Sequence, residues 1–181
     1  SARCATPSDD ERPIESRLAM TAALFLLNDL PAGDRVELTG DEGRHAARVR
    51  RLSTGESVLI GDGRGSLLDC VVSAVRADGL ELQVTSRRTV AAPNPRLVVV
   101  QALPKGDRAD LALEIMTELG VDEVIPWSAS RSVVQWQGAR GEKALWRWRR
   151  IAREAAKQSR RAWVPPVSEL ASTVAVAARI R

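Results

Sequence analysis

Five short apolar or alternating runs between residues 22 and 86 predict β-strands at regular spacing. Glycine, aspartate or proline punctuates the intervals between them, and this arrangement is typical of a small β-barrel or sandwich. A glycine-rich stretch at residues 61–65, GDGRG, joins two of the runs, and no helical pattern follows it. A hairpin turn is therefore favoured there over a dinucleotide-binding loop. The five runs are ALFLL, RVEL, SVLIG, SLLDCVVSAV and LELQVTS.

Residues 41–53, DEGRHAARVRRLS, lie between the second and third runs and predict a short helix. Asp41 is expected to cap it, because a carboxylate accepts hydrogen bonds from the unpaired N–H groups of a first helical turn. Arg44, Arg48, Arg50 and Arg51 make this region a basic patch. RNA binding and a solvated surface are its two interpretations, and the first is favoured.

The sequence Pro93-Asn94-Pro95 interrupts the strand pattern and predicts a domain boundary. The run RLVVVQAL at residues 96–103 is continuously apolar, which predicts a strand buried on both faces. Residues 121–127, VDEVIPW, predict the next strand.

A helix is predicted between these two strands, with Asp107 as its cap and Gly120 as its terminator. Leu111, Ile115 and Leu119 form its apolar stripe. A strand, a helix and a strand in this order predict a βαβ unit, with parallel strands and a right-handed crossover.

Residues 140–161 predict a long amphipathic helix that carries most of the chain's excess charge. Nine of its residues are Lys or Arg and two are Glu, so its net charge is +7, whereas the whole chain sums to +4. Two carboxylates cannot pair nine cations, so a polyanionic partner, most simply RNA, is favoured over a solvated helix with i,i+4 ion pairs. The expected core-facing stripe is Leu145, Trp148, Ile151, Ala152, Ala155, Ser159 and Ala162. The opposite face carries Lys143, Arg147, Arg150, Lys157 and Arg161, flanked by Arg149, Arg153 and Arg160.

Both ends of the chain differ from this middle part. Residues 1–19 are polar and without periodicity, which predicts a disordered leader or cloning residue, and Met20 is a plausible natural start. The closing stretch, SELASTVAVAARIR, suits a short helix, and no glycine occurs after Gly141. We therefore expect a leader at 1–19, a small β-barrel or sandwich with a basic patch at 20–92 and an incomplete α/β domain at 96–181.

Composition narrows the class of protein. The chain has 181 residues, of which 44% are apolar, enough for one medium domain or two small ones. Its pI near 9.8 favours an anionic partner. Cys4, Cys70 and the single histidine, His45, predict neither a disulfide framework nor a metal site, and a reducing cytoplasm is the simplest compartment. The sequence shows no apolar run long enough for a membrane span and no signal-peptide pattern near its start.

Three blocks of the chain, within residues 22–167, resemble the RsmE family. The blocks are DEGRHAARVRRLSTGE with GDGRG after it, QALPKGDRADLALEIMTELGVDEVIPWSASRS, and KALWRWRRIAREAAKQSRRAWVPPV. The middle block is the most specific, with a basic residue before a helix, Glu-Leu-Gly at its end and then Ser-x-Arg-Ser.

This resemblance implies a two-domain α/β protein, a PUA-like RNA-binding β-barrel followed by a SPOUT-type methyltransferase domain with a trefoil knot. It implies a homodimer that uses S-adenosylmethionine to methylate N3 of a uridine in small-subunit (16S) ribosomal RNA. The family's later segments, GPEGG-like and Leu-Arg-x-Glu-Thr-like, are not found in this sequence. We therefore expect the knot half and the cofactor-binding residues to be missing and the chain alone to be inactive. A non-catalytic RNA-binding or ribosome-associated module is the alternative.

Arg131, in the Ser-x-Arg-Ser block, is the predicted catalytic residue, because a cation near the base stabilises the deprotonated N3 of uracil. Its alternative role is a loop arginine paired with Glu118 or Glu123. Lys105 and Arg108 are expected to contact phosphate or substrate, and alternatively only flank a helix start.

The remaining predicted RNA-binding residues lie on the two basic stretches. Arg160 and Arg161 follow the family's helix-end pattern, and capping of a helix C-terminus is their alternative role. His45 is expected to be structural, whereas Trp146 is expected to stack a base or pack at an interface. Trp127, Trp136 and Trp163 are expected in the core or at an interface. The other RNA-binding candidates are Arg48, Arg50, Arg51, Arg147 and Arg150.

Overall fold

The computed structural model describes residues 22–106 and 108–180. The predictions for residues 1–19, Met20 and the Asp107 cap fall outside this part of the chain. The chain forms two compact units, the first ending at Thr89 and the second beginning at Val90, and Gly63–Gly65 groups with the second. None of the described helices is both long and apolar enough to cross a membrane.

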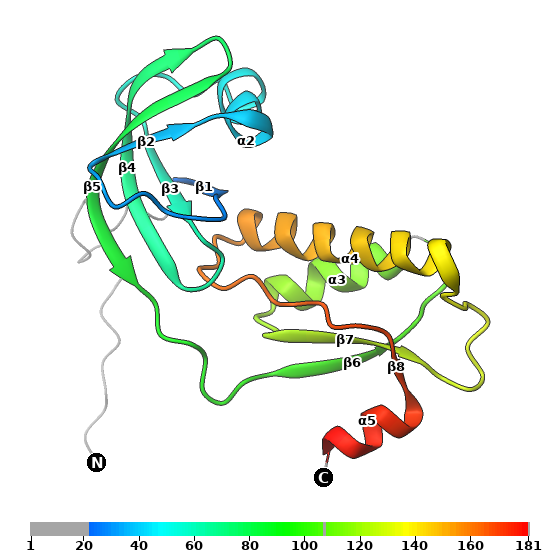
Figure 1. Ribbon diagram of the computed structural model, residues 1–181. Coiled ribbons are helices and arrows are strands. Elements are labelled where there is room, and N and C mark those ends of the chain that lie inside the picture. Colours follow the sequence, from blue (N-terminus) through cyan, green and yellow to red (C-terminus); the bar gives the residue numbers. More distant parts are fainter. Residues whose placement is uncertain (1–21, 107, 181) are drawn as a thin grey trace, which may run out of the picture. The chain divides into compact units, whose positions relative to one another are not determined.

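All five strands predicted before residue 90 are present, and they form one five-stranded sheet in the first unit (Figure 1). The strand order is β1-β3-β4-β5-β2, with β1 parallel to β3 and the other pairs antiparallel. The stretch at residues 61–65 is the predicted hairpin turn, in which Asp62 N–H donates to Ser66 O (3.2 Å). The strands are β1 Ala23–Leu26, β2 Arg35–Leu38, β3 Ser57–Gly61, β4 Ser66–Arg76 and β5 Gly79–Thr89.

A core of aliphatic side chains fills the first unit, with Phe25 as its one aromatic residue. The register of β4 against β5 shifts at Asp69/Cys70 and again at Val72/Ala74. Such bulges bend long strands around a core. Gly43 and Gly79 both approach the Leu38 carbonyl so closely that a Cβ on either would clash with it.

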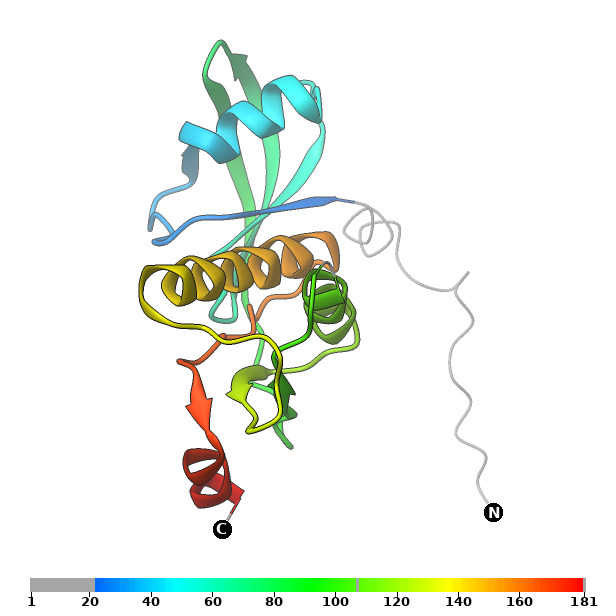
Figure 2. The same ribbon diagram turned by 90° about the vertical axis from the view of Figure 1, so that its right-hand side faces the viewer.

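The predicted helix of the first unit consists of α2 (Gly40–Arg44) continued by a π-helical turn, η2 (His45–Val49), and it packs against β5 (Figure 2). The prediction that Asp41 caps it is wrong. Thr39 occupies the N-cap position without a side-chain bond, and Asp41 lies inside the first turn, paired with Arg44. The Asp41 carboxylate therefore interacts favourably with the positive end of the helix dipole and with Arg44. It does not accept the hydrogen bonds of an N-cap.

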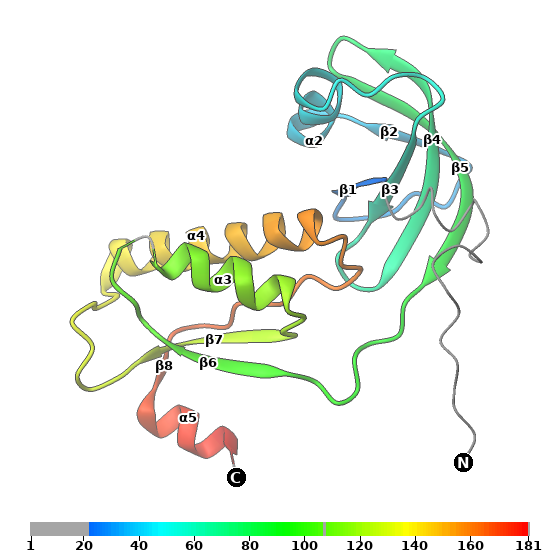
Figure 3. The same ribbon diagram turned by 180° about the vertical axis from the view of Figure 1, so that it is seen from behind.

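The second unit is a three-stranded parallel sheet in the order β6-β7-β8, with helices α3 and α4 together on one face of β6 and β7 (Figures 1 and 3). The βαβ unit was predicted, whereas the short strand β8 was not. Gly120, with a positive φ of 93°, ends α3 as expected. The elements are β6 Val98–Ala102, α3 Arg108–Glu118, β7 Glu123–Ser128, α4 Gly138–Gln158, β8 Ala171–Ser172 and α5 Thr173–Ile180.

Two burial predictions for this unit are wrong. Strand β6 is exposed or half-buried along its length, because it lies at the sheet edge. The stripe of Leu111, Ile115 and Leu119 on α3 faces solvent, and the helix packs through its other side, where Leu113 and Thr117 are fully buried. An apolar row at helical spacing does not by itself identify the buried side of a helix.

Helix α4 follows the predicted stripe through Leu145, Trp148, Ala152 and Ala155, all buried. It ends at Gln158, three residues before the predicted end. Lys157, expected on the exposed basic face, is buried and pairs with Glu154 (3.1 Å).

Candidate nucleic-acid interface

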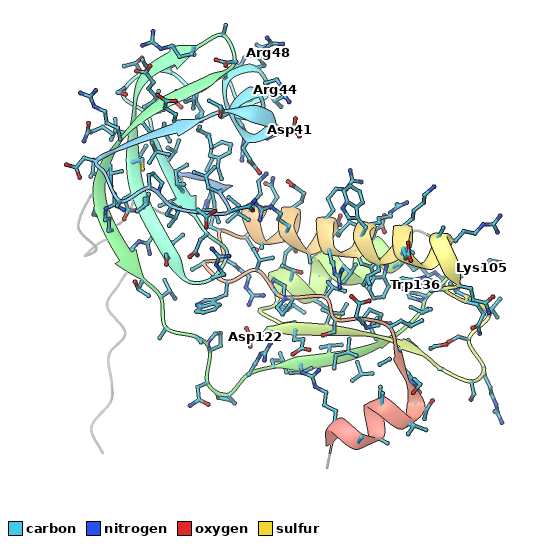
Figure 4. The ribbon with its side chains drawn as sticks, viewed as in Figure 1. Asp41, Arg44, Arg48, Lys105, Asp122 and Trp136 are labelled. Carbon is cyan, nitrogen blue, oxygen red and sulfur yellow. The ribbon has the colours of Figure 1, made fainter. Side chains whose placement is uncertain are left out.

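The first candidate surface is the end of the helix at residues 40–49. Arg48 is exposed, and its guanidinium donates one bond to Ala77 O (3.3 Å). Arg50 and Arg51 are exposed, and their guanidinium groups have no ion-pair or hydrogen-bond partner among the described residues. Arg51 has a positive φ of 53°, which turns the chain directly after the helix. Figure 4 labels Arg44 and Arg48 at this end of the unit.

The second candidate surface is the outward side of α4. Trp146 is 63% exposed, and the Arg150 guanidinium lies over its ring at 5.3 Å from the centroid. Lys143 and Arg140 are exposed about two and three helical turns before Arg150, and neither side chain has a partner among the described residues. An exposed indole beneath an arginine, on a helix that carries further exposed cations, is a combination that holds an unpaired base and its phosphates.

Other arginines of α4 are engaged within the second unit. Arg147 pairs with Asp110 of α3, and Arg149 donates to Val167 O (3.0 Å) and to Glu169 (2.7 Å). These arginines join α4 to neighbouring segments, and Arg147 and Arg149 both keep about half of their side chains exposed.

Arg161 lies after the helix end and is almost buried. Its guanidinium donates to the carbonyls of Thr117 (3.0 Å) and Gly120 (3.4 Å) and pairs with Asp122 (3.0 Å). The capping alternative therefore describes its geometry, although the helix that it caps is α3 rather than α4. Arg160 is exposed in a left-handed conformation, with φ 53°.

Three further predicted residues lie on the two loops that follow β6 and β7. Lys105 and Arg108 are exposed on the loop after β6 and at the start of α3, and Arg131 is exposed in the turn after β7. None of the three has a partner among the described residues. The alternative pairing of Arg131 with Glu123 is contradicted, because Glu123 binds Arg96 and Arg179 instead.

The same two loops border a cleft of about 230 Å³ in the second unit. Its walls include Pro104, Trp136 and the Asp110–Arg147 ion pair. Trp136 is half-buried and packs edge-to-face on the buried Trp148, with ring centroids 4.9 Å apart. Figure 4 labels Lys105 and Trp136 near the end where α4 begins. Parallel sheets place ligands beyond the carboxyl ends of their strands, and both loops leave that end of the sheet.

Sequence reasoning did not single out Asp110, and it interpreted Trp136 only as a core or interface residue. The one sequence feature that could have drawn attention to Asp110 is its position in the first turn of the helix that follows β6. Its partner, Arg147, lies 37 residues later on α4. Only the packing of α3 on α4 brings these two side chains together.

Metal and thiol chemistry find no support in the described residues. No cluster of three or more His, Cys, Asp or Glu side chains lies where it would hold a metal ion in residues 22–106 and 108–180. Burial of Cys70, together with the nearby charge of Asp69, raises the pKa of its thiol to about 11. The thiol is therefore protonated at neutral pH and is a poor nucleophile.

Each of the two units matches a family model. Residues 38–85 match an RNA methyltransferase PUA domain, and residues 92–181 match an RNA methyltransferase domain. A relative from Mycobacterium bovis, ribosomal RNA small subunit methyltransferase E, is 47% identical over 163 residues, which cover 90% of this chain and 62% of the relative. The Bacillus subtilis protein of the same name is 32% identical over 136 residues, covering 75% of this chain and 53% of the relative.

A solved structure shares the fold. The ribosomal RNA small subunit methyltransferase E of Neisseria gonorrhoeae, bound to S-adenosyl methionine, superimposes with a TM-score of 0.72 at 30% identity. The match covers 82% of this chain and 62% of that protein. The 181 residues thus span less than two thirds of the length of these relatives.

Proposed function

This chain belongs to the RsmE family of small-subunit ribosomal RNA methyltransferases, and on that premise we propose that it serves in the S-adenosylmethionine-dependent methylation of uridine N3 in 16S ribosomal RNA. Its own contribution is to hold the RNA. The observation that carries the proposal is a set of exposed cationic side chains, on both units, that have no partner among the described residues. They are Arg50, Arg51, Lys105, Arg108, Arg131, Arg140 and Lys143.

Methylation at N3 requires an unpaired uridine, because N3 lies on the Watson–Crick edge of the base. The base must also lose its N3 proton, and a cation beside it stabilises the resulting anion. Arg131 suits this task among the described residues, since its guanidinium is exposed and unpaired there, on a loop at the carboxyl end of β7. Lys105 and Arg108, on the preceding loop, suit the flanking phosphates.

The described residues do not fit S-adenosylmethionine by themselves. Backbone approach to a nucleotide-like cofactor generally requires glycine-rich turns. Such a turn does not occur after Gly141, the last glycine of the sequence, and the loop after β6 offers only Gly106. When bound, the cofactor supplies the methyl group, and we propose that its binding residues come from the part of the family's length that these 181 residues do not match. That the protein acts in the cytoplasm, and that it forms a homodimer, both stay predictions from the sequence.

RNA binding by residues 1–181 is expected to weaken as salt rises, because each neutralised phosphate releases counterions. Replacing Arg48, Arg50 and Arg51 together with alanine should weaken binding by about tenfold at low salt. A plot of log K against log salt has a negative slope, and each phosphate contact contributes about 0.7–0.9 to its magnitude. The same change should therefore make the slope shallower by roughly 2. Fluorescence anisotropy with a small-subunit ribosomal RNA fragment measures both quantities.

The matched control is Arg76→Ala, since Arg76 is an arginine of the same unit that already pairs with Glu81 (2.7 Å). This variant should keep the wild-type slope. An unchanged slope in the triple variant would remove the first unit from the RNA-binding surface.

Methyl transfer by the 181-residue chain alone is expected to be undetectable, because its residues do not fit the cofactor. Incorporation of label from S-adenosylmethionine into small-subunit ribosomal RNA measures it, with a full-length relative as positive control. Turnover by the isolated chain would show that these residues hold the cofactor after all.

A further inference from the structure

The cleft bordered by the loops after β6 and β7 brings together an aromatic wall and a charged pair from three different segments. We propose that this cleft is a subsite for one unpaired uracil base, stacked on Trp136 and read at its edge by Asp110 and Arg147. The inference rests on the proposed function, because it takes an RNA strand as the ligand.

The size and rigidity of the cleft suit a single planar ring. Its volume of about 230 Å³ is below the roughly 300–1,000 Å³ of sites for drug-sized ligands. The Trp136 indole is held by its edge-to-face contact with Trp148, at an interplanar angle of 82°, and Trp148 is itself buried. A fixed, half-buried indole loses little freedom when a base stacks on it, and stacking on aromatic side chains is how proteins commonly hold unpaired bases.

The ion pair supplies the polar recognition. Arg147 donates to a carboxylate oxygen of Asp110, so an acceptor and further N–H donors lie side by side in the cleft wall. Uracil presents N3–H between two carbonyl oxygens, so Asp110 can accept N3–H while Arg147 donates to a neighbouring carbonyl. Asp110 is 26% exposed and Arg147 is 56% exposed, so part of each side chain reaches the surface of the cleft. A carboxylate bonded to N3–H is also a suitable acceptor for the proton that N3 must lose.

The test compares two single-stranded RNAs that differ only at one position, which is uridine in one and 3-methyluridine in the other. Methylation removes the N3–H donor, so the wild-type chain is expected to bind the uridine RNA about tenfold more tightly, the effect of about one charge-assisted hydrogen bond. The Asp110→Ala variant should reduce this ratio to within twofold.

The matched control is Glu114→Ala, one turn further along α3, where the side chain is exposed and borders a different groove. It removes the same charge from the same helix and should keep the tenfold ratio. A wild-type ratio near one, or an Asp110→Ala ratio equal to that of wild type, would overturn the proposal. Urea unfolding of both variants shows whether the fold is retained.

Photocrosslinking provides a second readout that needs no variant. RNA with 5-iodouridine at the test position is expected to crosslink to Trp136, and mass spectrometry of the digested complex locates the adduct. Crosslinking to the exposed Trp146 alone would overturn the subsite. Salt-dependent RNA binding without uridine discrimination would reject only the cleft, whereas absence of RNA binding would reject the proposed function along with it.

Discussion

Replacing Arg161 with alanine is expected to lower the free energy of unfolding of the second unit by about 3 kcal/mol. The side chains of Arg161 and Asp122 are 14% and 8% exposed, and removing one partner of a buried ion pair leaves the other charge uncompensated, a change that costs about 3–5 kcal/mol. The carbonyls of Thr117 and Gly120 at the end of α3 also lose their donor. Urea denaturation followed by tryptophan fluorescence measures this, because all five tryptophans lie in the second unit.

The control for this variant is Arg140→Ala, which removes an exposed arginine from the first turn of α4 and should change stability by less than about 0.5 kcal/mol. At temperatures where both variants are folded, Arg161→Ala should bind RNA within about twofold of wild type, because its guanidinium faces protein carbonyls. Unchanged stability with strongly weakened RNA binding would restore Arg161 to the RNA-binding surface.

The prediction that Arg161 lies on the exposed basic face of the long helix is wrong, and the error has a definite physical cause. The predicted helix runs to residue 161, and at helical spacing this arginine continues the basic face of Arg147 and Arg150. The helix ends at Gln158, and the left-handed backbone of Arg160 then reverses the chain. This turn directs Arg161 to the end of α3 and to Asp122, which Figure 4 labels near the start of β7. Residues 157–161, KQSRR, contain neither glycine nor proline, so the sequence gives no indication that the helix ends at Gln158.

Local patterns were sufficient where one short segment determines its own structure. The five strands of the first unit and the hairpin after Gly61 follow from alternation and turn residues alone. Gly120 ends α3 because a positive φ there suits glycine. These features depend on neighbours in the sequence, and single-sequence reasoning therefore predicted them.

Features that depend on packing between distant segments were not predictable in the same way. Helix α3 has two apolar rows, and only its contact with α4 shows that the row with Leu113 is buried while Leu111, Ile115 and Leu119 are exposed. The cleft requires Asp110, Trp136 and Arg147 from three segments of the second unit. Its composition follows from the packed structure and not from any one motif.

Glu123 is a buried carboxylate that joins three segments of the second unit to the start of β7. It accepts hydrogen bonds from Ser168 Oγ (2.6 Å) and Arg179 Nη2 (2.6 Å), and it pairs with Arg96 (3.0 Å). Burial by itself would raise the pKa of Glu123. The hydrogen bonds from Ser168 and Arg179 and the charges of Arg179 and Arg96 outweigh it, and the pKa lies below its ordinary value of 4.5.

Because the folded-state pKa is lowered, the ionised Glu123 stabilises the fold above about pH 4.5, and this stability is lost as pH falls through the folded-state pKa. Replacing Glu123 with Gln is expected to lower the free energy of unfolding by about 2 kcal/mol at pH 7. This figure lies below the usual range for buried pairs because both arginines are about half exposed. The variant should also lose less stability than wild type between about pH 6 and pH 3, measured by urea denaturation at each pH.

The control is Glu142→Gln, which changes an exposed glutamate of α4 and should keep the wild-type pH dependence. Equal acid sensitivity in Glu123→Gln and wild type would contradict the lowered pKa, because that shift predicts that part of the acid sensitivity resides in this one carboxylate.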